Sequence, residues 1–327
     1  MQYWFQLRRL MIAGLASVAA AALAPAFAQE FPSGPIQIIC PSAPGGGSDR
    51  LSRLFARELE KLARQPVVVV NKVGAGALLG TRAAMSAKPD GYTLLLHASS
   101  AIVGNAYTVR DAGYDPTRDL VPIASVSQVG FALVVPARSR ANSVAELSAL
   151  LKQKKGSAFY ASANNAMAIA TELYKEAAGV DADRVNYKGT TDAMLAVASD
   201  PQIDFSFVDM SLAASQARSG RIRILAVTPN RRAAVEPSIP TMAEAGIPHY
   251  EYATILGVWA PRDTPKAVTQ KLSQWFQQLA NRDDIKAELV REGFDPLPGS
   301  ADTLARLVDE DAGRWSSFVK SGKLDVN

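Results

Sequence analysis

The feature that most constrains the fold is an alternation of apolar runs with amphipathic helical patterns. Residues 36–40, 67–70 and 93–96 predict strands, and leucines recur at helical spacing over residues 51–62. Because this alternation joins parallel strands through crossover helices, it predicts an α/β fold. Residues 67–70 are four consecutive valines, so we expect their strand to be buried on both faces.

The rhythm changes in the middle of the chain. Two apolar runs, residues 123–129 and 131–135, follow each other with no helix between them, which predicts a crossing into a second lobe. A new α/β series then leads to residues 222–227, a strand that we expect to cross back. Ligands of such sheets bind beyond the carboxyl ends of the strands, so we expect a ligand cleft between the lobes. The predicted lobes are residues 29–135 with 225–327, and residues 136–224.

The first 28 residues have the pattern of a secretory signal peptide. Arg8 and Arg9 precede an apolar stretch at residues 10–23, and Ala26-Phe27-Ala28 is an A-x-A cleavage site. We therefore expect cleavage before Gln29 and a periplasmic location. The alternative is an uncleaved N-terminal anchor, and the pattern leaves open whether export uses the Sec or the twin-arginine route.

Composition narrows the class of protein. The chain has 327 residues and a net charge of +4, which falls to about +2 when the two signal-peptide arginines are removed. That charge is too small to indicate nucleic-acid binding. Cys40 is the only cysteine, so no intramolecular disulfide is possible, and we expect it to be a small buried hydrophobe.

Residues that carry out catalysis are not grouped in this sequence. The two histidines, His97 and His249, are far apart, and no G-x-S-x-G motif occurs. We expect His97 to pack at a strand end and His249 to be solvated. One cysteine and two distant histidines cannot form a metal cluster of the usual spacing. We therefore predict no catalytic residue, no metal site and no cofactor.

A glycine-rich loop at residues 41–49 follows the first predicted strand and opens a helix. The free N–H groups and the dipole of a helix start favour an anion. The loop residues Gly46, Gly47, Ser48 and Asp49 are therefore candidates for holding a carboxylate. The alternative is a tight turn in which Ser48 or Asp49 caps the helix.

A corresponding loop in the second lobe contains Ala163, Asn164 and Asn165, again between a strand and a helix. Side-chain amides and backbone N–H groups there are candidates for the far end of a ligand, although two N-capping asparagines explain the pattern equally well. Asp209 ends another strand of this lobe. It is a candidate acceptor for a ligand or a bridging water, or a solvated strand end.

A second glycine loop, with Gly74, Gly76 and Gly80, resembles the loops of dinucleotide-binding proteins. Two observations oppose a nucleotide site. The next strand ends at His97 rather than at the acidic residue that holds a ribose, and Asn71 and Lys72 lengthen the turn. An enzyme that uses a nicotinamide cofactor is therefore the less favoured alternative.

Several segments together resemble the substrate-binding proteins of tripartite tricarboxylate transporters, also called the Bug family of periplasmic receptors. The resemblance covers essentially the whole chain after the signal peptide, and the order and spacing of the segments carry it. These segments are residues 35–49, 70–76, 89–95, 187–189, 225–228 and 239–246.

The resemblance implies a two-lobed, type II periplasmic-binding-protein-like α/β fold with two crossover strands. It also implies that a small organic acid is held by backbone N–H groups and ordered waters at two loops, one in each lobe. Carried over residue by residue, these are Gly46, Gly47, Ser48 and Asp49 in the first lobe, and Ala163, Asn164 and Asn165 in the second.

The sequence departs from the family pattern on one wall of the expected pocket. Residues 162–165 are Ser-Ala-Asn-Asn where glycine-rich sequence is usual, and Ile255 stands where tryptophan is common. A dicarboxylate, a tricarboxylate and an aromatic acid therefore all stay open as ligands. The implied partners are the membrane subunits of a tripartite transporter or a sensor, and we expect a monomer.

Overall fold

The computed structural model describes residues 31–324 and residue 326. From Gly34 onward the chain forms one compact unit, to which the following description applies. The predicted signal peptide at residues 1–28 lies outside the described residues. Within the described part, no helix has the length and apolar character needed to cross a membrane.

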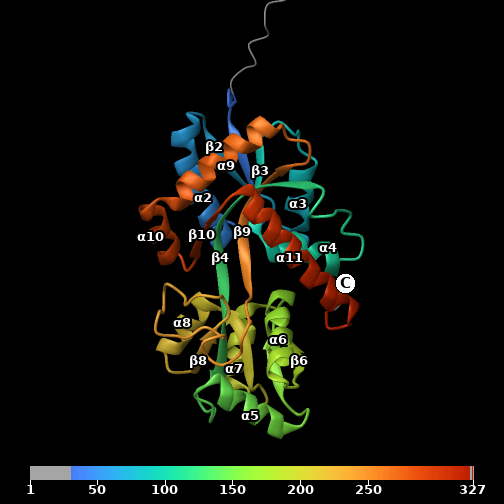
Figure 1. Ribbon diagram of the computed structural model, residues 1–327, viewed down its shortest axis with the longest axis vertical. Helices are drawn as coiled ribbons and strands as arrows, with labels where there is room; N and C mark the ends of the chain where they lie inside the picture. The colour runs from blue at the N-terminus through green and yellow to red at the C-terminus, as the bar shows by residue number, and fades with distance from the viewer. Residues whose placement is uncertain (1–30, 325, 327) are drawn as a thin grey trace, which may run out of the picture. The chain divides into compact units, whose positions relative to one another are not determined.

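Strands and helices alternate over most of this unit (Figure 1), as the sequence predicts. The elements in chain order are β1 (Ile36–Cys40), α2 (Gly47–Ala63), β2 (Val67–Asn71), the short 3₁₀ helix η1 (Ala75–Ala77), α3 (Leu78–Met85), β3 (Thr93–Ala98), α4 (Ser99–Thr108), β4 (Leu120–Pro136), α5 (Val144–Lys154), β5 (Phe159–Ser162), α6 (Asn165–Ala178), β6 (Asp183–Asn186), α7 (Thr190–Ser199), β7 (Phe205–Asp209), α8 (Met210–Arg218), β8 (Ile222–Val227), β9 (Ala253–Pro261), α9 (Lys266–Asn281), α10 (Asp283–Arg291), β10 (Asp295–Gly299) and α11 (Ala301–Lys320).

The strands form a mixed sheet in the order β2-β1-β3-β9-β4-β7-β5-β6, with β8 and β10 also paired to β4. Strands β1, β2 and β3 are parallel, and so are β5, β6 and β7. The carboxyl ends of each parallel group are followed by the starts of helices. The α/β class predicted from the sequence is confirmed.

Strand β2 lies at the edge of the sheet, where it pairs with β1. The side chain of Val68 is 52% exposed, so the prediction that this strand is buried on both faces is wrong. A run of valines indicates a strand, but it does not reveal whether a neighbour covers both faces and both edges.

Strand β4 passes through both halves of the sheet, and Figure 1 shows it running from the α2, α9 and α11 group of helices into the α5 to α8 group. Its residues 120–130 pair with β9, and its residues 131–136 pair with β7 and β8. The two predicted apolar runs are therefore one continuous strand. We call the part built on β1–β3, β9 and β10 lobe 1, and the part built on β5–β8 lobe 2.

The return to lobe 1 differs from the expectation. Strand β8 pairs with Ala132–Pro136 of β4 and so belongs to lobe 2, whereas the strand that returns is β9, which pairs with β3 and with the first part of β4. An apolar strand has the same sequence pattern in either lobe, so its pattern does not locate the crossing. By pairing, we place the change of lobe near Gly130 and Ala253.

Gly130 occupies a crowded position at this change. A Cβ atom on Gly130 would lie 2.3 Å from Cγ of Pro229, in the segment that follows β8. Only glycine allows the backbone of β4 to approach that segment so closely. The close approach fixes where the second connection passes beside β4.

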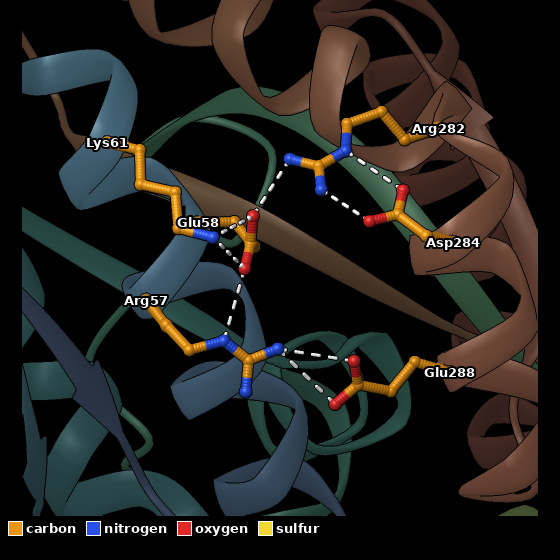
Figure 2. A network of polar contacts seen from close by, with 6 residues as sticks. All are labelled: Arg57, Glu58, Lys61, Arg282, Asp284 and Glu288. Atoms are coloured by element: carbon orange, nitrogen blue, oxygen red, sulfur yellow. Dashed lines mark hydrogen bonds and ion pairs between the residues drawn. The ribbon is translucent and has the colours of Figure 1, made fainter.

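A cluster of charged side chains ties α2 to the start of α10 (Figure 2). Glu58 of α2 is 3% exposed and accepts hydrogen bonds from Lys61 at 2.8 Å, Arg57 at 3.1 Å and Arg282 at 2.8 Å. Burial acts to raise the pKa of Glu58, but these donors outweigh it and lower the pKa to about 2. Arg282 in turn pairs with Asp284. The carboxyl-terminal half of α2 is thereby fixed, which holds the helix start in place.

Candidate functional site

A cleft of about 890 Å³ is lined by residues of both lobes. The starts of α2, α4 and α6 meet there, and Asp209, the residue before α8, lines it as well. Because the first N–H groups of a helix have no partner within the helix, converging helix starts offer donors and positive dipole ends to an anion. The lining residues from these starts are Gly47, Ser48, Ser100, Ala101, Asn165 and Ala166.

The first loop brings Gly47 and Ser48 to the cleft, whereas Gly46 and Asp49 are not among the lining residues. The N-cap of α2 is Gly46, which makes no side-chain capping bond, so the alternative of Ser48 or Asp49 as the N-cap is wrong. The sequence pattern placed the N-cap two or three residues too late.

Asp49 lies in the first turn of α2 and is 2% exposed. Its carboxylate accepts hydrogen bonds from the Gly45 N–H at 2.9 Å, Arg53 Nε at 2.9 Å and Asn71 Nδ2 at 2.8 Å. Burial acts to raise its pKa, but the bonds from Arg53, Asn71 and Gly45 outweigh burial and lower the pKa to about 2. Asp49 therefore holds the loop in shape from behind.

The second loop brings all three of its predicted residues to the cleft: Ala163, Asn164 and Asn165. Asn164 is the N-cap of α6, and its side-chain oxygen accepts the Met167 N–H at 3.0 Å. The capping alternative therefore describes Asn164. Asn165 is the first helical residue, and its Oδ1 lies 3.5 Å from Nη1 of Arg184.

Asp209 lines the cleft at the end of β7. No hydrogen bond or ion pair reaches its carboxyl group from the described residues, and burial raises its pKa.

His97 is 8% exposed, does not line the cleft, and has a pKa that burial lowers to about 4. It packs at the end of β3 as expected, and His249 is exposed.

The second glycine loop contributes Ala75 and Gly76 to the cleft wall. The side chain of Asn105 donates to the Gly76 carbonyl at 2.7 Å. A Cβ atom on Gly80 would lie 2.7 Å from Cγ of Pro41 and 2.8 Å from the Lys72 carbonyl oxygen. Gly80 is therefore explained by the close packing of α3 against the first loop, without a phosphate group.

Sequence reasoning missed two arginines of the cleft. Arg50 forms an ion pair with Glu292 and donates to the Gly45 carbonyl at 2.7 Å. Arg184 projects from β6, and both arginines line the cleft. Arg184 is the second residue of β6, whereas the sequence reasoning expected ligands at the carboxyl ends of strands, so the fold was needed to show that this side chain reaches the cleft. Phe131 and Leu256 add apolar wall.

Chemical groups for catalysis do not gather in this cleft. Among residues 31–324 and 326, no three His, Cys, Asp or Glu side chains are placed to hold a metal ion. Cys40 is fully buried in β1 and does not reach the cleft. The arrangement is suited to binding an anion through backbone and amide donors.

Comparison with known proteins identifies the family. Residues 51–324 match the tripartite tricarboxylate transporter family receptor. The chain is 31% identical to protein BugT of Bordetella pertussis over 321 residues, which cover 96% of this chain and 97% of that protein.

Two solved structures share the fold. One is R. palustris Rpa4515 with adipate, which is 28% identical, has a TM-score of 0.73, and aligns over 89% of this chain and 98% of that one. The other is MatC (Rpa3494) from Rhodopseudomonas palustris with bound malate, which is 26% identical, has a TM-score of 0.69, and aligns over 88% and 100%. Members of the matched family are periplasmic substrate-binding receptors, not enzymes. The chain belongs to the tripartite tricarboxylate transporter receptor family.

Proposed function

We propose that this protein captures a small organic carboxylate in its cleft by closure of the two lobes and delivers it to a membrane transporter. The observation that carries the proposal is the convergence of helix starts from both lobes on one cleft. A ligand that bridges them binds the closed arrangement more tightly than the open one, and so favours closure by that difference in affinity.

In this proposal the backbone of lobe 1 holds one carboxylate. The N–H groups at Gly47 and Ser48 are donors in the cleft wall, while Gly46 and Asp49 support the loop that presents them. Across the cleft, Ala163, Asn164 and Asn165 provide the contacts of lobe 2. Asp209 accepts a hydrogen bond from the ligand or from a bridging water.

The class of ligand follows from the size and lining of the cleft. A volume of about 890 Å³ with both polar and apolar walls admits a dicarboxylate, a tricarboxylate or an aromatic acid. The proteins with adipate and with bound malate support the dicarboxylates as the first probes. Export by the predicted signal peptide, action as a monomer, and docking on the membrane subunits of a tripartite transporter complete the proposal.

Thermal unfolding of residues 29–327 against a panel of acids tests the proposal. The panel contains di- and tricarboxylates, aromatic acids, amino acids and nicotinamide cofactors. A ligand at about 100 times its dissociation constant adds about 2.7 kcal/mol of stability, which raises the melting temperature by a few degrees. A shift with one class of acid is the expected result. No shift with any acid would contradict the proposal.

A matched pair of variants locates the site. Asn165→Asp places a carboxylate at the start of α6 in the cleft and should abolish the shift, because the new charge repels an acid and pairs with the neighbouring Arg184. Asn142→Asp makes the same change at an exposed position before α5 and should leave the shift intact. Small-angle scattering should show a more compact protein only when the stabilising acid is present.

A further inference from the structure

Arg184 is held in the cleft wall with part of its hydrogen-bonding capacity unused. It projects from β6 beside the start of α6, and its Nε is buried without a hydrogen-bond partner. Among the described residues, its side chain has one hydrogen bond, from Nη1 to Asn165 Oδ1 at 3.5 Å, which is at the long limit for such a bond. No carboxylate of residues 31–324 or 326 forms an ion pair with it.

Arg50, the other arginine of the cleft, has a guanidinium group whose charge is neutralised. Arg50 pairs with Glu292 and also donates to the Gly45 carbonyl. Both of its partners belong to lobe 1, so its charge is already compensated before any ligand arrives. Arg184 has no such compensation, although an arginine taken partly out of water is stabilised by a paired anion.

Asp209 is the cleft carboxyl group that belongs to the same lobe, but it stands on another strand. Strand β5 lies between β6, which carries Arg184, and β7, which ends at Asp209. Two strand spacings separate the backbones by about 10 Å. No ion pair or hydrogen bond joins the two side chains in the described part of the chain. Arg184 and Asp209 therefore both line the cleft, but they do not neutralise each other.

We propose that Arg184 is the counter-ion for a second acidic group of the ligand, so that the cleft selects dianionic carboxylates over monoanionic ones of similar size. This assignment rests on the proposed capture of a carboxylate. It adds a charged contact in lobe 2 to the backbone donors of the helix starts. The Nε of Arg184 is enclosed, so the Nη groups are the ones that can meet a carboxylate in the cleft, through charge-assisted hydrogen bonds.

The test compares matched probes on three variants and the wild type. Adipate is paired with hexanoate, and phthalate with benzoate, so that each pair differs by one carboxylate. Dissociation constants are measured by calorimetry for the wild type, Arg184→Gln, Arg184→Lys and Arg140→Gln. Arg140 is exposed in lobe 2 outside the cleft, so its variant controls for the loss of one positive charge.

In the wild type, the diacid of at least one pair should bind more tightly than its monoacid. Arg184→Gln should weaken diacid binding by about 10- to 100-fold, the value of a charge-assisted hydrogen bond, and change monoacid binding by less than about 3-fold. Arg184→Lys, which keeps the charge but loses the paired geometry, should lie between, and Arg140→Gln should match the wild type. Melting temperatures without ligand verify that each variant is folded.

The outcomes separate this assignment from the proposed function. If the wild type binds acids but Arg184→Gln keeps its preference for the diacid, Arg184 is not the counter-ion and the capture function stands. If the wild type binds monoacids as tightly as diacids, the assignment of Arg184 as the counter-ion is likewise wrong and the capture function stands. A wild type that binds none of these four acids overturns the assignment, and a wild type that also binds no acid of the wider panel overturns the proposed function.

Discussion

The two loops that face each other across the cleft are built in different ways. In the loop of lobe 1, the acidic side chain of Asp49 turns away from the cleft and accepts three hydrogen bonds, and the cleft is lined by Gly47 and Ser48. In the loop of lobe 2, the side chain of Asn165 and its neighbour Arg184 face the cleft. If the proposed function holds, lobe 1 binds the carboxylate group that all candidate acids share, and lobe 2 carries the side chains that distinguish among these acids.

The largest expected effect on stability comes from disrupting the loop of lobe 1. Asp49→Ala should lower the free energy of unfolding by about 3 kcal/mol, because it leaves the buried donors of Asn71 and Gly45 without their acceptor. Urea unfolding measures it. The control is Asp283→Ala, a fully exposed aspartate in α10, which should change stability by less than about 0.5 kcal/mol. A similar small loss in both variants would show that Asp49 does not hold the loop.

Protonation of Asp49 at low pH should also destabilise the folded protein, by less than the Asp49→Ala substitution does. The pKa of Asp49 is lowered from 3.8 to about 2 in the folded protein, so its stabilisation is present above about pH 4 and is lost as the pH falls toward 2. The loss amounts to about 2 kcal/mol. Glu58 titrates in an overlapping window. The difference between the wild type and Asp49→Asn, measured from pH 7 to pH 2, isolates Asp49, and a constant difference would contradict the assignment.

The loop of lobe 2 should respond more weakly. Asn164→Ala removes the N-cap of α6 and should cost about 1 kcal/mol. Asn165→Ala removes a side chain that caps nothing, so it should leave the free energy of unfolding within about 0.5 kcal/mol of the wild type and weaken acid binding. Unfolding and binding measured on both variants would sharpen the comparison. If Asn165→Ala were the more destabilising change, lobe 2 would also depend on its loop side chains for rigidity.

The smallest effect concerns Asp209. Burial raises its folded-state pKa, so its ionised form is destabilising, and this cost appears as the pH rises above the ordinary carboxyl range. Without ligand, Asp209→Asn should therefore raise stability at pH 7 by less than about 1 kcal/mol, with no gain near pH 3. Thermal unfolding at the two pH values measures it. A stability loss at pH 7 would indicate that the ionised carboxyl has a partner.

Much of the fold could be predicted because its signals are local. Apolar runs, helical periodicity and glycine loops locate β1, α2 and β3 within a few residues. The exposed face of Val68 and the membership of β8 in lobe 2 could not be predicted, since both depend on which distant strand pairs with which. Pairing across long sequence separations leaves no mark in the pattern of one strand.

The candidate site shows the same limit in a different form. The loops at Gly47 and Asn165 were predicted because a strand, a loop and a helix start follow in sequence. The sequence did not predict that the side chain of Asp49 points away from the cleft, because its orientation depends on hydrogen bonds from Arg53 and from Asn71 of the next strand. Arg184 was missed because its partner in the loop, Asn165, lies on another element.

The path of β4 and β9 through the sheet also has a consequence for the order of folding. The strands that pair with one another in lobe 2 lie within residues 131–227, whereas β3 pairs with the distant strand β9, in which Trp259 is the partner of Leu95. Closing so long a loop is slow. We therefore expect the amides of β5 and β7 to gain protection from hydrogen exchange earlier in refolding than those of β3. Until β9 arrives, lobe 1 presents an open sheet edge, which makes that interval the period of greatest risk of aggregation.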